Sequence, residues 1–113
     1  MIVSFPWPDK RLSPNARLHW AQKAKAVKAY KETCYWLMRT AGRPKLGDKI
    51  PVTITFYPPT KRRYDLDNRI ASFKAGQDGI ASALGVDDCL FEPTYKRGDA
   101  IKGGQVSVEF VSV

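Results

Sequence analysis

The residues of this chain whose types and spacing could do chemistry are four aspartates placed in two pairs. Asp65 and Asp67 are one residue apart, and Asp87 and Asp88 are adjacent. In an extended backbone alternate side chains share a face, so we expect Asp65 and Asp67 to point the same way while Leu66 points into the core. Two carboxylates on one face repel each other unless a positive charge lies between them.

Two kinds of positive charge could neutralise the first pair. Arg62 and Arg63 come just before it, in the segment Lys61-Arg62-Arg63-Tyr64-Asp65-Leu66-Asp67-Asn68. The other is a hard divalent cation, because carboxylate oxygens are its preferred ligands and Mg²⁺ needs few of them. Mg²⁺ held there could polarise a phosphodiester and ionise an attacking water. The segment is therefore a candidate phosphodiesterase centre.

Each pair also has a purely structural interpretation. Asp67 and Asn68 could cap a helix that begins after them, and Asp87-Asp88 could form an ordinary turn after Gly85. The setting favours metal binding, because the chain carries 19 Lys and Arg against 11 Asp and Glu, a net charge of +8. Such a charge favours polyanionic partners, nucleic acid first, although a basic protein without such a partner is an alternative.

Other reactive residues narrow the chemistry further. His19 is the only histidine, which argues against a Ser-His-Asp triad and excludes a His-rich metal site. Cys34 and Cys89 are too few for a disulfide framework or a zinc site. Lys74 could reach a phosphate, or it could pair with Asp78 four residues later on a helix.

Hydrophobic periodicity predicts the elements that must position these residues. We expect strands at 2–5, 52–57, 90–96 and 105–113, helices at 18–40 and 69–84, and basic loops at 9–17 and 97–104. This β-α-β-α-β-β order predicts a two-layer α/β (α+β) domain with a mixed sheet. The apolar stripe of the first helix comprises Trp20, Val27, Tyr30, Cys34, Leu37, Met38 and Ala41.

Glycine and proline mark the ends of these elements. Gly42 ends the first helix and Gly85 the second, while Pro93 indicates an edge or a bulge in the third strand. Gly76 and Gly79 would weaken the second helix by roughly 1 kcal/mol each relative to Ala, unless close packing requires them.

Length and composition indicate a single domain over residues 1–113. A chain of this size buries about 65% of its unfolded surface, and 43% of its residues are hydrophobic. The Met1-Ile2-Val3 start shows no signal peptide, and no apolar run is long enough for a membrane span. We expect a cytoplasmic protein that does not enter membranes.

Several motifs, in chain order, resemble the RusA family of Holliday junction resolvases, small endodeoxyribonucleases common in phages and prophages. They are Pro6-Trp7-Pro8, Ser13-Pro14-Asn15, the block from Arg62 to Asn68, and Asp87-Asp88. The resemblance covers nearly the whole chain. It implies that Asp65, Asp67 and Asp88 are catalytic and bind Mg²⁺, with Asp87 as an alternative ligand.

The resemblance also implies a homodimer that nicks two opposing strands of a four-way DNA junction. A family lysine in the helix after the Asp-Leu-Asp-Asn motif contributes to DNA binding. Here the third position after Asn68 is Ala71, and Lys74 lies one turn later. The spacing from this motif to Asp87-Asp88 is longer than in the type member of the family.

We therefore expect a Mg²⁺-dependent, structure-selective endodeoxyribonuclease. Its alternatives are a non-catalytic nucleic-acid-binding module and a basic assembly protein with no nucleic-acid role. Phosphate contacts are also expected from Lys25, Lys28 and Lys31 in the first helix. The main expected DNA-binding residues are Lys10, Arg11, Asn15, Arg17, Arg62, Arg63, Lys74, Lys96, Arg97 and Lys102.

One geometric constraint bears on the acidic residues. A helix of 16 residues is about 24 Å long, so Asp67 before it and Asp88 after it cannot share a metal along a straight helix. Either the helix breaks near Gly76 or Gly79, or the chain folds back, or Asp88 comes from another subunit. We favour the last arrangement, a composite site in an intertwined dimer.

Overall fold

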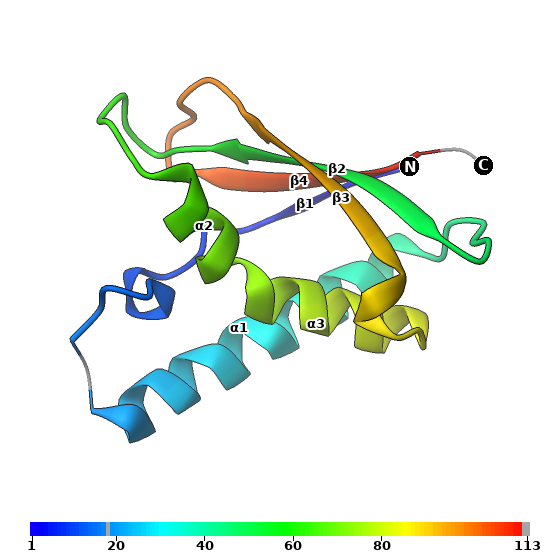
Figure 1. Ribbon diagram of the computed structural model, residues 1–113, viewed down its shortest axis with the longest axis horizontal. Coiled ribbons are helices and arrows are strands. Elements are labelled where there is room, and N and C mark those ends of the chain that lie inside the picture. The colour runs from blue at the N-terminus through cyan, green and yellow to red at the C-terminus, as the bar shows by residue number, and fades with distance from the viewer. Residues whose placement is uncertain (18, 112–113) are drawn as a thin grey trace.

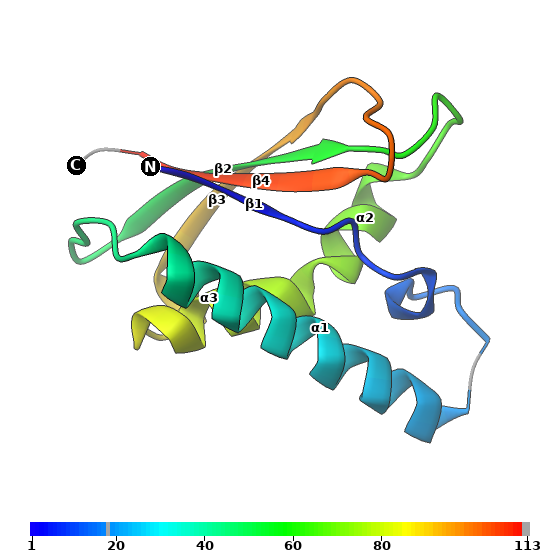
Figure 2. The same cartoon turned by 180° about the vertical axis from the view of Figure 1, so that it is seen from behind.

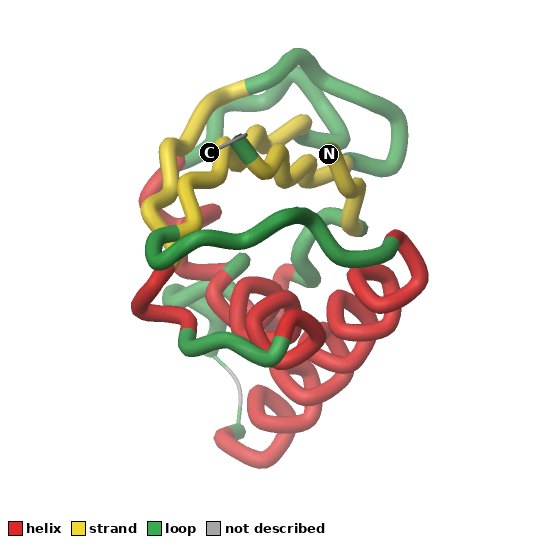
Figure 3. Tube along the Cα trace, turned by 90° about the vertical axis from the view of Figure 1, so that its right-hand side faces the viewer, coloured by secondary structure: helices red, strands yellow, loops and turns green. Residues whose placement is uncertain are grey.

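The chain folds into two layers, a four-stranded sheet and a set of helices against one of its faces (Figures 1 and 3). The computed structural model describes residues 1–17 and 19–111. The expected α+β class with a mixed sheet is confirmed. The elements are β1 (Ile2–Phe5), η1 (Lys10–Leu12), α1 (Trp20–Ala41), β2 (Ile50–Tyr57), α2 (Leu66–Ser72), α3 (Lys74–Leu84), η2 (Asp88–Leu90), β3 (Phe91–Arg97) and β4 (Gln105–Phe110), where η denotes a 3₁₀ helix.

Most boundaries agree with the sequence to within two residues. The expected loop at 9–17 contains the short η1 helix, and η2 occupies the position where the third strand was expected to begin. Leu18, the expected start of the first helix, and Ser112 and Val113, the expected end of the last strand, lie outside the described residues.

The sheet has the strand order β1-β4-β2-β3. Strand β4 is antiparallel to both β1 and β2, whereas β2 and β3 are parallel. The parallel pair is joined through α2 and α3, as a parallel pair requires a long crossover. Strand β2 alternates, with Ile50, Val52, Ile54 and Phe56 buried. Pro93 lies on the edge strand β3, as its missing N–H predicted.

Helix α1 packs on the sheet and on α3 through residues four apart. Ala26, Tyr30, Cys34 and Met38 are buried. The Tyr30 hydroxyl donates to the backbone carbonyl of Pro6 at 2.6 Å, which ties the helix to the segment after β1. Although α1 is 22 residues long, no helix in the described part of the chain is long and apolar enough to cross a membrane.

The expected apolar stripe of α1 is only partly covered, so that part of the prediction is wrong. Trp20 is 76% exposed, Val27 37% and Leu37 38%, and Ala41 is also exposed. The first turns of α1 extend beyond the N-terminal end of α3, as Figure 2 shows from behind. Trp20 therefore has the helical phase of a core residue without the neighbours that would bury it.

The second predicted helix is two helices. The chain changes direction at Phe73, whose φ of −85° and ψ of −4° lie in the bridge region between helix and strand. Its ring is fully buried, with ring centres 6.2 Å from Phe5, 6.1 Å from Tyr30 and 6.0 Å from Phe56. The expected break near Gly76 or Gly79 lies instead at this aromatic anchor.

The two glycines of α3 are required by close packing. A Cβ at Gly79 would overlap the backbone carbonyl of Lys31 in α1, and a Cβ at Gly76 would lie 2.9 Å from the Tyr30 ring. Gly85 ends α3 with a left-handed φ of 68°, as predicted. The helix backbones of α1 and α3 can thus approach each other only because α3 lacks side chains at these positions.

We predict that Gly79→Ala lowers the free energy of unfolding by about 1–3 kcal/mol, the usual cost of overpacking. The backbone of α1 must move to admit the new methyl group. Chemical denaturation monitored by circular dichroism measures the change. Ser82→Ala on the exposed side of α3 is the control and should change stability by less than about 0.5 kcal/mol. A Gly79→Ala protein as stable as the control would contradict the packing argument.

Candidate functional site

Asp65 and Asp67 lie at the beginning of α2. Asp65 is the N-cap residue, and its Oδ1 accepts a hydrogen bond from the backbone N–H of Asp67 at 2.9 Å. The expectation that Asn68 caps the helix is wrong, as is the extended backbone expected at Asp67, because the helix already begins at Leu66. The expected outcome nevertheless holds, because both carboxylates are exposed and Leu66 between them packs against the core. A helical backbone produces this arrangement, not the extended one that was expected.

No lysine or arginine among residues 1–17 and 19–111 forms an ion pair with Asp65 or Asp67. Arg62 and Arg63 are exposed, and neither neutralises the pair. The two carboxylates therefore face solvent in a basic protein without a cationic partner. Such oxygens remain available to a hard cation.

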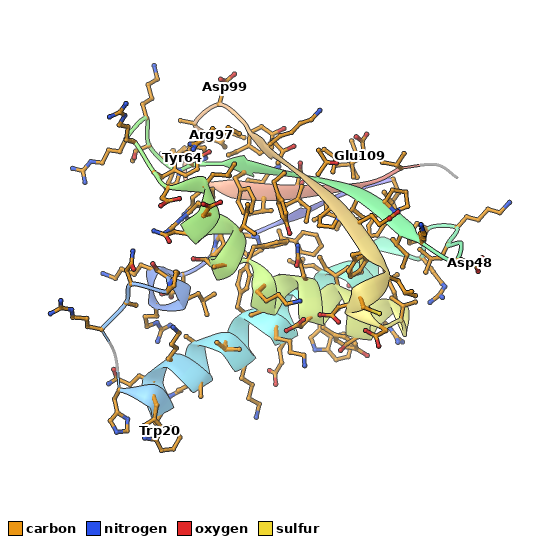
Figure 4. All side chains as sticks on the ribbon, viewed as in Figure 1. Trp20, Asp48, Tyr64, Arg97, Asp99 and Glu109 are labelled. Atoms are coloured by element: carbon orange, nitrogen blue, oxygen red, sulfur yellow. The ribbon has the colours of Figure 1, made fainter. Side chains whose placement is uncertain are left out.

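Basic residues of the loop before α2, of the end of β3 and of the loop after it lie at one end of the sheet, where Figure 4 labels Tyr64 and Arg97. Asp65 directly follows the first of these segments in the chain. The Arg97 guanidinium lies 4.7 Å from the centre of the Tyr64 ring, and its Nη1 donates to the Tyr64 carbonyl at 3.3 Å. The N–H of Ile101 donates to the carbonyl of Pro58 at 2.9 Å, which joins the two loops directly. The exposed cations of this region, here called the basic loop end, are Lys61, Arg62, Arg63, Lys96, Arg97 and Lys102.

The basic segment between β1 and α1 lies below the basic loop end, where η1 packs against α1 and α2. Lys10, Asn15 and Arg17 are exposed there. Arg11 instead donates from Nε and Nη2 to the carboxylate of Asp9 at 3.2 and 3.1 Å. These hydrogen bonds lower the pKa of Asp9, so the charge of Arg11 is locally offset.

The second aspartate pair has local partners. Asp87 caps η2 by accepting from the N–H of Cys89 at 3.0 Å. The Lys74 ammonium donates to Asp88 Oδ2 at 2.6 Å and lies 3.5 Å from Asp78 Oδ1. The hydrogen bond from Lys74 holds the pKa of Asp88 below its usual range, and the same bond raises the pKa of Lys74. The predicted pairing of Lys74 with Asp78 is confirmed, and Asp88 is a second partner.

These placements decide how well one chain suits a metal ion. Asp78, Asp87 and Asp88 line an open groove of about 280 Å³, while Asp65 and Asp67 lie before α2. Nowhere in the described residues do three or more Asp, Glu, His or Cys side chains form a group that could hold a metal. The donor chemistry of Asp65 and Asp67 suits Mg²⁺, but a site that also includes Asp88 is not assembled within the described residues of one chain. The helix break at Phe73 does not bring the two pairs together.

Sequence reasoning did not single out Tyr64 as part of this region. Its ring packs edge-on against Trp7, with ring centres 6.1 Å apart, and Trp7 packs in the same way on Phe56 in the core. Tyr64 thus connects the Arg97 contact to the sheet. A tyrosine between Arg63 and Asp65 has no local signal for this role, because all of its partners are distant in sequence.

The fold and site describe a basic α+β domain with exposed acidic residues at a cationic end. No family model matches the sequence. An uncharacterized protein of Xylella fastidiosa (strain Temecula1) is 40% identical over 116 residues, which cover 98% of this chain and 76% of the relative. The chain belongs to the same family as this Xylella protein. The relative brings no activity with it, so the RusA resemblance remains a prediction.

We predict that Lys74→Gln raises the pKa of Asp88 towards the ordinary aspartate value, because the charged hydrogen bond is lost. A carbon-13 NMR titration of the Asp88 carboxyl measures the shift. Lys49→Gln, which removes the partner of Glu92, is the control and should leave the pKa of Asp88 unchanged.

The ion pair also makes stability depend on pH. Because Asp88 has a lowered pKa in the folded state, its pair with Lys74 stabilises the fold above the ordinary aspartate pKa. That contribution disappears as pH falls through the lowered value. An unchanged Asp88 titration in Lys74→Gln would show that the ion pair does not form in solution.

Proposed function

We propose that this protein is a Mg²⁺-dependent, structure-selective endodeoxyribonuclease that resolves four-way DNA junctions as a homodimer. The observation that carries the proposal is the position of Asp65 and Asp67. Both are exposed and lack a cationic partner among the described residues, yet they adjoin the basic loop end. Acids in a phosphate-binding region oppose binding unless they have a second role, and metal binding is the role that their chemistry supports.

The proposed Mg²⁺ site takes Asp65 and Asp67 from one subunit and Asp88 from the other. One chain holds these residues in separate places, so a complete ligand set requires a second chain. Asp88 must give up its ion pair with Lys74 to take part. Asp87 is the alternative ligand, although its Oδ1 already caps η2.

DNA would contact the exposed cations of the basic loop end and of the segment before α1. These side chains suit phosphates, which position a duplex without reading its sequence. A two-fold dimer suits a four-way junction, because the junction offers two equivalent strands for cleavage. Affinity should fall steeply with salt, by about one unit of log–log slope for each phosphate neutralised.

We predict that the protein cleaves a labelled four-way junction only when a divalent cation is present. Asp67→Asn should abolish cleavage while keeping or tightening junction binding, because it removes a ligand and a negative charge together. Gel electrophoresis of the products and a mobility-shift assay measure the two properties. Asp48→Asn, in the loop before β2 at the opposite end of the molecule (Figure 4), is the matched control and should cleave normally. Cleavage by Asp67→Asn at the control rate would overturn the catalytic assignment.

The composite site predicts complementation between inactive subunits. We expect mixed Asp67→Asn and Asp88→Asn subunits to regain nicking at one of the two sites, since one of the two shared sites in a heterodimer has all its wild-type ligands. Nicking of a supercoiled cruciform plasmid measures this activity. Each variant alone, at the same total concentration, is the control. Heterodimers as inactive as the single variants would disprove sharing between subunits.

A second candidate is a non-catalytic DNA-binding module. The structural roles of Asp65, Asp87 and Asp88 favour it, because two of them cap helices and the third pairs with Lys74. The junction assay separates the two functions. Binding without cleavage under any divalent cation supports the module, and the absence of any complex at low salt excludes both.

A further inference from the structure

The first turns of α1 carry an exposed aromatic side chain at the end of the molecule. Trp20 is the first residue of the helix and is 76% exposed (Figure 4). The ring of His19 lies 5.5 Å from it, tilted by 34°, and His19 caps the helix by accepting from the N–H of Ala21 through Nδ1. The indole is therefore held on an ordered helix end rather than on a loop, and most of its surface is open.

A groove lies along the same face of α1. Residues 20, 23 and 27 share one side of a helix, and Lys23 and Val27 line an open groove of about 240 Å³ between α1, η1 and the start of α3. Leu12 and Ala71 also line it, together with Lys74 and Asp78, whose side chains form an ion pair at 3.5 Å. Trp20 thus lies one turn before Lys23 on the side of α1 that borders the groove, although its own side chain is not part of the groove lining.

The charge of the chain segment that carries Trp20 selects the occupant. Residues 10–31 contain seven Lys and Arg and no Asp or Glu. Lys25 and Lys28 are exposed on the projecting turns of α1. Proteins that bind single-stranded nucleic acid combine a cationic groove with aromatic rings on which bases stack. The combination fits a strand with an accessible base better than it fits a closed duplex.

We propose that Trp20 stacks on an unpaired nucleobase while the phosphates of the same strand contact Lys23 and the neighbouring lysines of α1. This inference rests on the proposed DNA role. It adds a second surface, away from Asp65 and Asp67, that binds a DNA strand whose bases are unpaired. Trp36, the other exposed tryptophan, is 62% exposed and lies beside Tyr35, with ring centres 5.0 Å apart. It lies in the second half of α1, beyond the residues of this helix that line the groove, and provides a matched control.

The test measures the affinity of the full chain for a short fluorescein-labelled oligothymidylate by anisotropy. Trp20→Ala should weaken binding by roughly 5- to 100-fold, the effect of losing one base–aromatic stack. Trp20→Phe should keep most of the affinity, and Trp36→Ala should match the wild type. The slope of log affinity against log salt concentration should be the same for Trp20→Ala and wild type, because the phosphate contacts remain.

A second probe isolates the base from the phosphates. An abasic oligomer of equal length and charge should bind wild type and Trp20→Ala equally, because it offers nothing to stack on. Equal affinity of wild type and Trp20→Ala for oligothymidylate would overturn the inference. An effect of Trp20→Ala on dimerisation alone would also overturn it, because it would assign this face to a second copy of the chain. An effect on binding of anionic vesicles alone would overturn it by assigning the face to a membrane.

The same measurements separate this inference from the proposed enzyme. If oligothymidylate binding depends on Trp20 but no divalent cation supports junction cleavage, the nuclease proposal fails and the stacking surface stands. If the junction is cleaved and Trp20→Ala binds oligothymidylate normally, the nuclease stands and the stacking surface is wrong. A wild-type chain that binds neither probe rejects both.

Discussion

The burial of the Phe73 ring is the constraint on which the other features of this structure depend. It packs against rings from β1, β2 and α1 at once, so it fixes the helical layer to the sheet at one point. Helices α2 and α3 leave this point in different directions (Figure 1). The absence of a side chain at Gly79 then lets α3 lie directly against the backbone of α1. Aromatic burial and close helix contact together set the positions of both ends of the α2–α3 crossover.

The two ends of the crossover carry the two acidic pairs, and their surroundings differ. Asp65 and Asp67 open α2 beside the basic loop end, where Arg97 contacts Tyr64 instead of a carboxylate. Asp88 follows α3 and meets Lys74. The first pair has no counter-ion among the described residues, whereas one member of the second, Asp88, is paired with Lys74. The carboxylates without a cationic partner and the one held by Lys74 thus lie at opposite ends of the crossover.

The long first helix divides into two parts with different environments. Its second half is buried against the sheet and α3 through Tyr30, Cys34 and Met38. Its first half extends beyond them and combines Trp20 with exposed lysines. An apolar stripe that continues past the core either promotes aggregation or marks an interaction site, because large exposed apolar side chains are not needed for folding. The excess of Lys and Arg over acids in residues 10–31 is what favours a polyanion.

The sequence by itself determined the strands, the helix ends and the surplus of positive charge, because these depend on local alternation, on backbone freedom at Gly42 and Gly85, and on composition. It also placed Asp65 and Asp67 at the surface through the half-buried Leu66 between them. Only the tertiary structure decided that the crossover bends at Phe73, that Lys74 forms an ion pair with Asp88 and that the Trp20 side chain is exposed. Periodicity reports that a side chain faces one side of its own element. Whether another element covers that side depends on contacts between residues that are far apart in the chain.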